Sequence, residues 1–111
     1  MAPLPNGDQA ILDLRKLEDY CLDPSHHRGR HKARVFQRAL SIGQPDAAWL
    51  RETLLVGARS CEAVEQTTDL YGTRWRVDVP AARQDRIVVI RSVWIVRVGE
   101  SVPQFVTCWV L

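Results

Sequence analysis

The chain has 111 residues, a length at which one domain can bury one hydrophobic core. Hydrophobic residues make up 46% of it and charged residues 25%, a balance that excludes an intrinsically disordered protein. Its apolar runs are far shorter than the roughly 20 residues that cross a bilayer, and residues 1–9 lack the basic start and apolar run of a signal peptide. We therefore expect one domain, residues 1–111, that is cytoplasmic and has no membrane partner.

The cysteines and the missing motifs narrow the chemistry further. Cys21, Cys61 and Cys108 are widely separated and show no CxxC or Cys/His spacing, so we expect reduced packing residues rather than a disulfide framework or a zinc site. The chain has no Walker loop and no GxGxxG, GxSxG or zinc-deaminase motif. Nucleotide-driven, hydrolase-elbow and zinc-dependent reactions are therefore disfavoured, and no cofactor is expected.

Positive charge is concentrated in one segment of an almost neutral chain. The formal net charge is only +2. Residues 26–38 nevertheless hold five of the 15 Arg and Lys residues and all three His residues, with no Asp or Glu among them. The segment therefore predicts a local positive field that attracts an anionic partner.

The first half of the sequence predicts helices. Residues 1–9 contain two prolines and an Asn-Gly turn pair, which predict an extended lead-in. Residues 11–22 have apolar side chains at helical spacing and end at an Asp-Pro stop, and residues 29–42 form a helical pattern that Gly43 ends. A third helix begins near Pro45 and runs to about residue 60. The residues expected to face the core are Leu14, Leu17, Cys21, Ala33, Phe36, Ala39, Leu40, Ala47, Leu50, Leu54 and Ala58.

The second half of the sequence predicts strands. Alternating or Val/Ile-rich runs are typical of β-structure, and turn residues at 80–85 and 99–103 separate them. Helices followed by strands predict an α+β fold, with two to three N-terminal helices packed on one face of a three- to four-stranded antiparallel sheet. The predicted strands are residues 61–67, 74–79, 86–98 and 104–111.

Side-chain parity separates the two faces of the predicted sheet. Successive residues of a strand point to opposite faces, so residues 104–111 divide into two sets. We expect the smaller set to pack on the helices and the other face to combine Arg91 with Thr107 and aromatic rings. The first set is Val106, Cys108 and Val110, and the second is Phe105, Thr107 and Trp109.

The basic segment is the strongest candidate for a functional site. Arginine presents a planar fork of donors that suits phosphate, and histidine exchanges protons near neutral pH. In a helix over residues 29–42, Lys32 falls at the edge of the apolar stripe, and it is either an amine that reaches into a cleft or a lysine whose stem lies along the surface. The segment as a whole is either a phosphate site or a solvated helix face. The cationic side consists of Arg30, His31, Arg34 and Arg38.

Three further assignments stay open. His27 and His31 have a spacing that suits a metal, but the neighbouring cations oppose a divalent ion, so no metal site is expected. Arg91 interrupts a Val/Ile-rich strand and is either a phosphate ligand or the ion-pair partner of Asp78. The choice between core packing and base stacking applies to Trp75, Trp94 and Trp109.

Several strings occur in an order that resembles a family of small bacterial domains of unknown function. They are LPNGDQ, KLEDYCLDPSH, GRHKARVF, YGTRW, RSVWIVR and QFVTCWVL. Such domains resemble modules seen at the C-termini of bacterial polymorphic toxins and phage head proteins and as small stand-alone proteins. Their helix-then-sheet layout resembles the metal-independent ribonucleases of the barnase and RelE types. One departure is His27, where that family commonly has proline. The matching residues are His26, Gly29, Lys32, Phe36, Tyr71, Gly72, Trp94 and Thr107.

The resemblance implies a toxin-like, metal-independent ribonuclease that acts on RNA phosphodiesters. The implied partners are RNA and a cognate immunity or antitoxin protein. The alternatives are a non-enzymatic module that binds a nucleic acid or a protein through residues 26–38, and a structural domain in which Lys32 and Arg91 lie apart in local ion pairs. In the ribonuclease hypothesis the roles are proton transfer by His26 or His31, charge stabilisation by Lys32 and Arg91, phosphate positioning by Thr107, and RNA binding by Arg30, Arg34, Arg38 and Trp109.

Overall fold

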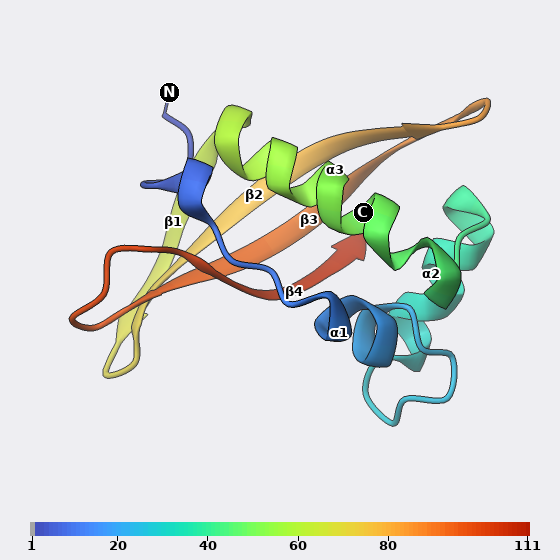
Figure 1. The fold of residues 1–111 in the computed structure, drawn as a ribbon, viewed down its shortest axis with the longest axis horizontal. Helices are drawn as coiled ribbons and strands as arrows, with labels where there is room; N and C mark the ends of the chain where they lie inside the picture. The colour runs from blue at the N-terminus through green and yellow to red at the C-terminus, as the bar shows by residue number, and fades with distance from the viewer. Residues whose placement is uncertain (1) are drawn as a thin grey trace.

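A computed structural model describes residues 2–111 and shows three α-helices followed by a four-stranded antiparallel sheet (Figure 1). The predicted α+β fold is therefore confirmed. No helix within residues 2–111 has both the length and the apolar character needed to cross a membrane. The helical elements are η1 (Gly7–Gln9), α1 (Leu14–Lys16), η2 (Leu17–Cys21), α2 (Arg30–Leu40), η3 (Gln44–Asp46) and α3 (Ala47–Ser60). The strands are β1 (Ala63–Asp69), β2 (Gly72–Arg83), β3 (Arg86–Arg97) and β4 (Gln104–Val110).

The start of the chain differs from the prediction. α1 begins only at Leu14, where the Asp13 side chain caps it by accepting a hydrogen bond from the Arg15 amide at 3.0 Å. The chain then continues as the π-helical turn η2. Ile11, predicted to be helical, instead forms a β-bridge with Gln104. Residues 7–9 form a 3-10 turn rather than an extended lead-in, and residue 1 of that lead-in lies outside the described residues.

α2 and α3 present the predicted faces to the core. Phe36 and Leu40 of α2 and Leu54 of α3 are buried, as the helical spacing predicts. α2 ends earlier than expected, because Ser41 rather than Gly43 adopts the left-handed conformation that closes the helix, with φ of 56°. The Ser41 amide donates to the carbonyl of residue 37 at 3.0 Å.

The strands form a meander in the order β1-β2-β3-β4. β2 and β3 pair along their whole length, so β2 is longer than predicted and the turn between them is confined to residues 84–85. Pro80, predicted to lie in that turn, stands inside β2 opposite Val89. β1 starts to pair with β2 only at Val77, so the edge of β2 on which Pro80 lacks an N–H has no neighbouring strand there.

The helices cover one face of the sheet, and α3 lies across it in Figure 1. Val77, Ile90 and Trp94 are buried on this face. Phe105 was predicted on the opposite face, but a bulge changes its direction: Val93 pairs with Thr107 and Trp94 with Phe105, which leaves Val106 extra in β4. Phe105 therefore packs edge-to-face on Trp94, with ring centres 5.4 Å apart. We call the opposite side the open face; its residues are Arg74, Arg76, Asp78, Val89, Arg91, Val93, Ile95, Thr107 and Trp109.

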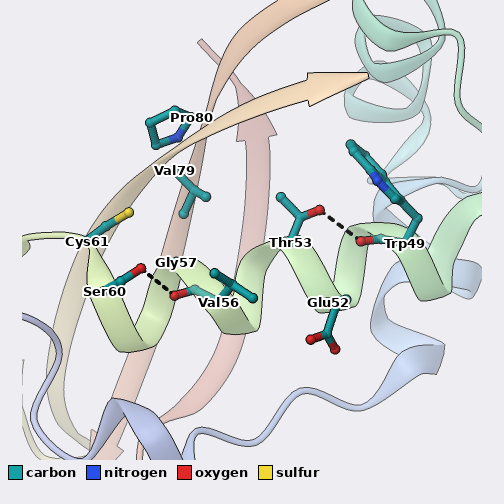
Figure 2. Close-up of a pocket in the computed structure, with 9 residues that line it drawn as sticks. All are labelled: Trp49, Glu52, Thr53, Val56, Gly57, Ser60, Cys61, Val79 and Pro80. Carbon is teal, nitrogen blue, oxygen red and sulfur yellow. Dashed lines mark hydrogen bonds between the residues drawn. The ribbon is translucent and has the colours of Figure 1, made fainter. Parts of the chain in front are cut away.

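α3 approaches β2 closely at Gly57, which faces Val79 (Figure 2). A Cβ at Gly57 would lie 2.8 Å from Val79 Cγ1 and closer still to Cγ2. The glycine therefore sets the distance between the helix and the sheet.

We expect Gly57→Ala to lower the free energy of unfolding by about 1 to 3 kcal/mol, because overpacking against the stiff Val79 outweighs the gain of about 1 kcal/mol in helix propensity. Urea unfolding followed by circular dichroism measures this change. In a Val79→Ala background the same substitution should cost less. An equal cost in both backgrounds would show that this contact is not the cause.

Candidate functional site

The Lys32 ammonium lies where α2 meets β4, and side chains from two other segments hold it. Its Nζ donates to Thr107 Oγ1 at 2.8 Å and to Tyr20 Oη at 2.9 Å. The same nitrogen lies 5.5 Å from the ring centre of Trp109, within the range of a cation–π interaction. Tyr20 comes from η2, Lys32 from α2, and Thr107 and Trp109 from β4. We call Tyr20, Cys21, Lys32, Thr107 and Trp109 the Lys32 cluster.

Among the residues that the structure describes, the ammonium has no acidic counter-ion. Within residues 2–111, the ion pairs with N–O distances up to 4.0 Å do not include Lys32. The side chain is half-buried, and both hydrogen-bond acceptors are neutral hydroxyl groups. The hypothesis that Lys32 forms a local ion pair is therefore wrong. Taking a cation partly out of water without a counter-ion costs free energy, which an anionic ligand at this position would offset.

A groove of about 460 Å³ opens beside the amine. His31 and Trp109 line it together with Lys32, and Val35 and Val110 supply apolar walls. His31 is exposed, so its imidazole can reach a ligand in the groove. One ammonium, one imidazole and one indole on an apolar floor match the phosphate and the base of a nucleotide.

His26 has a different position from His31. Its Nδ1 accepts hydrogen bonds from the amides of Arg28 and Gly29, both at 2.9 Å, just before α2 begins. Its ring packs edge-to-face on Tyr20 with ring centres 4.9 Å apart. His26 thus satisfies backbone donors ahead of the helix and supports the tyrosine that holds Lys32, and its free nitrogen is Nε2.

Gly29 allows η2 and the start of α2 to pack closely. A Cβ at this position would lie 2.8 Å from the carbonyl carbon of Tyr20 and still closer to its oxygen. Only a glycine leaves room for this backbone approach. The approach brings the Tyr20 hydroxyl within hydrogen-bond distance of Lys32, so Gly29 shapes the site without contacting a ligand.

Two buried cysteines, Cys21 of the cluster and Cys108, lie next to Thr107. Cys21 Sγ lies 3.9 Å from Thr107 Oγ1. The Cys108 thiol is the main cause that lowers the pKa of the Cys21 thiol to about 7; the Cys108 amide, Thr107 and Lys32 act in the same direction, and burial opposes them. Burial raises the pKa of Cys108 well above its ordinary value. Cys21 is therefore the first of the two thiols to lose its proton.

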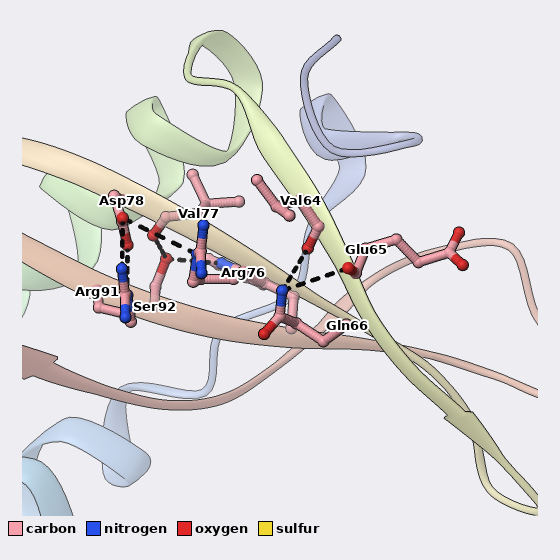
Figure 3. A network of polar contacts seen from close by, with 9 residues as sticks. Val64, Glu65, Gln66, Arg76, Val77, Asp78, Arg91 and Ser92 are labelled. Atoms are coloured by element: carbon pink, nitrogen blue, oxygen red, sulfur yellow. Dashed lines mark hydrogen bonds and ion pairs between the residues drawn. The ribbon is translucent and has the colours of Figure 1, made fainter. Parts of the chain in front are cut away.

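Arg91 is occupied by a carboxylate. Its Nε and Nη2 donate to the two oxygens of Asp78 at 2.8 and 3.0 Å on the open face (Figure 3). This bidentate pair lowers the pKa of the Asp78 carboxyl. Arg91 stands opposite Trp109 in the β3–β4 register. Of the two alternatives for Arg91, the structure shows the ion pair with Asp78, and Arg91 is not among the hydrogen-bond partners that hold the cluster.

The remaining candidates lie outside the groove. Arg30, Arg34 and Arg38 are exposed on the outer side of α2. His27 lies in the turn before α2 and so does not share a helix face with His31. Across residues 2–111, no group of three or more His, Cys, Asp or Glu side chains is placed to hold a metal ion.

Another groove, between α3 and β2, has a different chemical character (Figure 2). Trp49, Val56 and Val79 line much of it, and its hydroxyl groups are already bonded within α3. Thr53 Oγ1 donates to a carbonyl at 3.0 Å and Ser60 Oγ to another at 2.7 Å. With a carboxylate, Glu52, as its charged lining residue, this groove does not suit a phosphate.

The fold and the site define a small α+β domain with helices on one sheet face and an uncompensated lysine in a groove at the sheet edge. The chain belongs to the DUF6883 family, a domain of unknown function, whose pattern matches residues 3–111. The expected likeness to a small domain of unknown function is thus confirmed. No curated protein and no solved structure matches the chain.

Sequence reasoning missed two members of the Lys32 cluster, Tyr20 and Cys21. The sequence predicts Cys21 as a packing residue, and its burial agrees, but its contact with Thr107 joins it to the site. Tyr20 lies in the string KLEDYCLDPSH, which predicts no role for it. The only available signal was its place in that string, because its contact with Lys32 depends on the close approach at Gly29.

The low pKa of Cys21 should make stability depend on pH. Between pH 7 and 9.0 the folded Cys21 has lost a proton that the unfolded chain retains, so the free energy of unfolding should rise with pH in this window. The expected rise is on the order of 2 kcal/mol. Urea unfolding at several pH values under reducing conditions measures it, and Cys21→Ser should remove the rise.

Cys108 acts in the opposite direction but at higher pH. Its folded pKa lies above that of the unfolded chain, so its contribution to stability is lost only as pH rises beyond 9.0. The two thiols therefore affect different parts of the profile. Parallel pH profiles for the wild type and Cys21→Ser between pH 7 and 9.0 would contradict the assignment to Cys21.

Proposed function

We propose that this domain is a toxin-like, metal-independent ribonuclease whose reaction takes place in the groove at Lys32. The observation that carries the proposal is the half-buried ammonium of Lys32, which lacks a carboxylate partner, is held by two hydroxyl groups and lies beside His31. An amine held in this way is preorganised to stabilise the negative charge that develops on a phosphodiester during cleavage.

The reaction requires three tasks of the groove. A base removes the proton of the RNA 2′-hydroxyl, and the 2′-oxygen then attacks phosphorus. The bond from phosphorus to the 5′-oxygen breaks, and an acid gives that leaving oxygen a proton. We assign charge stabilisation to Lys32 and one proton transfer to His31, because both line the groove. Tyr20 and Thr107 both accept hydrogen bonds from Lys32. We assign phosphate positioning to Thr107, whose hydroxyl proton would turn from Cys21 Sγ, 3.9 Å away, to the phosphate oxygen.

A second candidate function is nucleic-acid binding without turnover. It is favoured by a specific observation: His26 Nδ1 already accepts hydrogen bonds from two backbone amides, and Arg91 already donates two hydrogen bonds to Asp78. His31 is then the imidazole that lines the groove, whereas cleavage needs both a base and an acid. A binding module would use the same ammonium and the exposed arginines of α2 for phosphate contacts.

We expect the purified domain to cleave single-stranded RNA in the presence of EDTA, and Lys32→Met to lower the cleavage rate by about 100-fold or more. The reason is that methionine keeps the stem packed but removes the charge. Arg59→Met is the matched control, because it removes an exposed cation from α3, away from the groove, and should leave the rate unchanged. Circular dichroism checks that both variants fold.

Two other results are informative. Salt-sensitive RNA binding that Lys32→Met abolishes, without any RNA product from the wild type, would select the binding module. A wild-type domain that leaves all RNA substrates intact and binds none, with a cellular effect equal to that of Lys32→Met, would exclude both functions.

A further inference from the structure

A second cation-lined groove lies at the other end of β4. Its volume is about 340 Å³, and it takes cationic side chains from α1, β2 and β3 and an aromatic side chain from the turn between β1 and β2. Nothing in the proposed reaction uses it. The lining residues that matter here are Lys16, Tyr71, Arg74 and Arg97.

The charge in this groove is only partly neutralised. Arg74 pairs with Asp69 at 2.7 Å. Lys16 Nζ donates to a neutral acceptor, the carbonyl of Phe105, at 2.8 Å. Arg97 is exposed, and within residues 2–111 neither it nor Lys16 has a carboxylate within the 4.0 Å of an ion pair. The groove therefore retains about two positive charges, which favours an anionic ligand.

Tyr71 adds an aromatic surface to these cations. Its side chain is 73% exposed, although its backbone is fixed: its amide donates to Asp69 at 2.9 Å and its carbonyl accepts from Val98 at 3.1 Å. An exposed ring on a fixed backbone loses little entropy when a base stacks on it. Cations and an aromatic ring in one groove are typical of sites for single-stranded nucleic acid.

The two grooves lie on one strand. Trp109 and Val110 line the Lys32 groove, and Phe105 and Val106 line the second. The two pairs are offset by four positions, which corresponds to about 13 Å along β4. Arg76 and Arg91 lie between them on the open face and share the single carboxylate Asp78 (Figure 3). These three side chains therefore carry a net charge of +1 on the open face, beside the uncharged Val93 and Thr107.

We propose that the groove of Lys16, Tyr71, Arg74 and Arg97 is a second phosphate subsite, which binds a single-stranded RNA that extends across the open face from Lys32. This inference rests on the proposed function for the first subsite. It implies that the substrate is an oligonucleotide rather than a dinucleotide, since only a longer strand reaches both grooves. It also favours single strands over duplexes, since Trp109 and Tyr71 can stack only on unpaired bases.

The test compares Arg97→Glu with Arg59→Glu, which makes the same change in net charge on α3. Binding is measured by fluorescence anisotropy on single-stranded DNA of about 12 nucleotides, which lacks the 2′-hydroxyl and cannot be cleaved by this reaction. We expect Arg97→Glu to weaken binding about tenfold and to reduce the slope of log affinity against log salt by about one. Tyr71→Ala should weaken binding without changing that slope.

Cleavage of a ribodinucleotide separates this inference from the proposed function. The dinucleotide occupies only the Lys32 groove, so Arg97→Glu should leave its cleavage unchanged. Loss of DNA affinity in Arg97→Glu, with no RNA cleavage by the wild type, would support the subsite and overturn the ribonuclease. Lys32-dependent cleavage together with equal DNA affinities for Arg97→Glu and Arg59→Glu would overturn the subsite alone.

Discussion

The hydrogen bond from Lys32 to Thr107 joins the helical half of the chain to its last strand, across 75 residues of sequence. β4 is an edge strand, and an uncovered edge is prone to pair with other chains. The first half of the chain covers it with polar contacts: Ile11 exchanges backbone hydrogen bonds with Pro103 and Phe105, and Lys16 binds the Phe105 carbonyl. Both lysines of this arginine-rich chain therefore bind β4. The position of Lys32 follows from the way the first half of the chain covers this edge strand.

The contrast between Lys32 and Arg91 explains why the site centres on the lysine. Arg91 gives its donors to Asp78 in a bidentate pair, so an incoming phosphate would have to displace a carboxylate. Lys32 gives two donors to neutral hydroxyl groups and can offer its charge without losing a partner. The arginines on the outer side of α2 have free charge but no groove, and long exposed side chains lose entropy when they bind. Lys32 therefore combines an ammonium group held in a fixed position with a positive charge that no carboxylate of residues 2–111 neutralises.

Local periodicity predicted the parts of the fold where one face of an element is buried, including α2, α3 and the paired regions of the strands. The predictions failed where a distant backbone competes for hydrogen bonds. Ile11 has helical spacing but pairs with Gln104, and Phe105 has the wrong parity because Val106 bulges out of β4. The candidate site likewise could be predicted where it depends on local spacing and not where it depends on contacts with distant segments. The position of Lys32 at the edge of its helix could be predicted, whereas its contact with Tyr20 depends on a backbone approach that sequence spacing does not encode.

The distribution of charge matters more here than its total. The open face and its two grooves hold six cations and two carboxylates, whereas the whole chain has a formal charge of +2, so the rest of the molecule is formally −2. A field polarised in this way steers an anionic strand toward one side of the domain and orients it before contact. The helices on the other face contribute the core that keeps the strands in register. Because the helices cover only one face of the sheet, the cations of the open face remain exposed to solvent, where a polyanion can reach them.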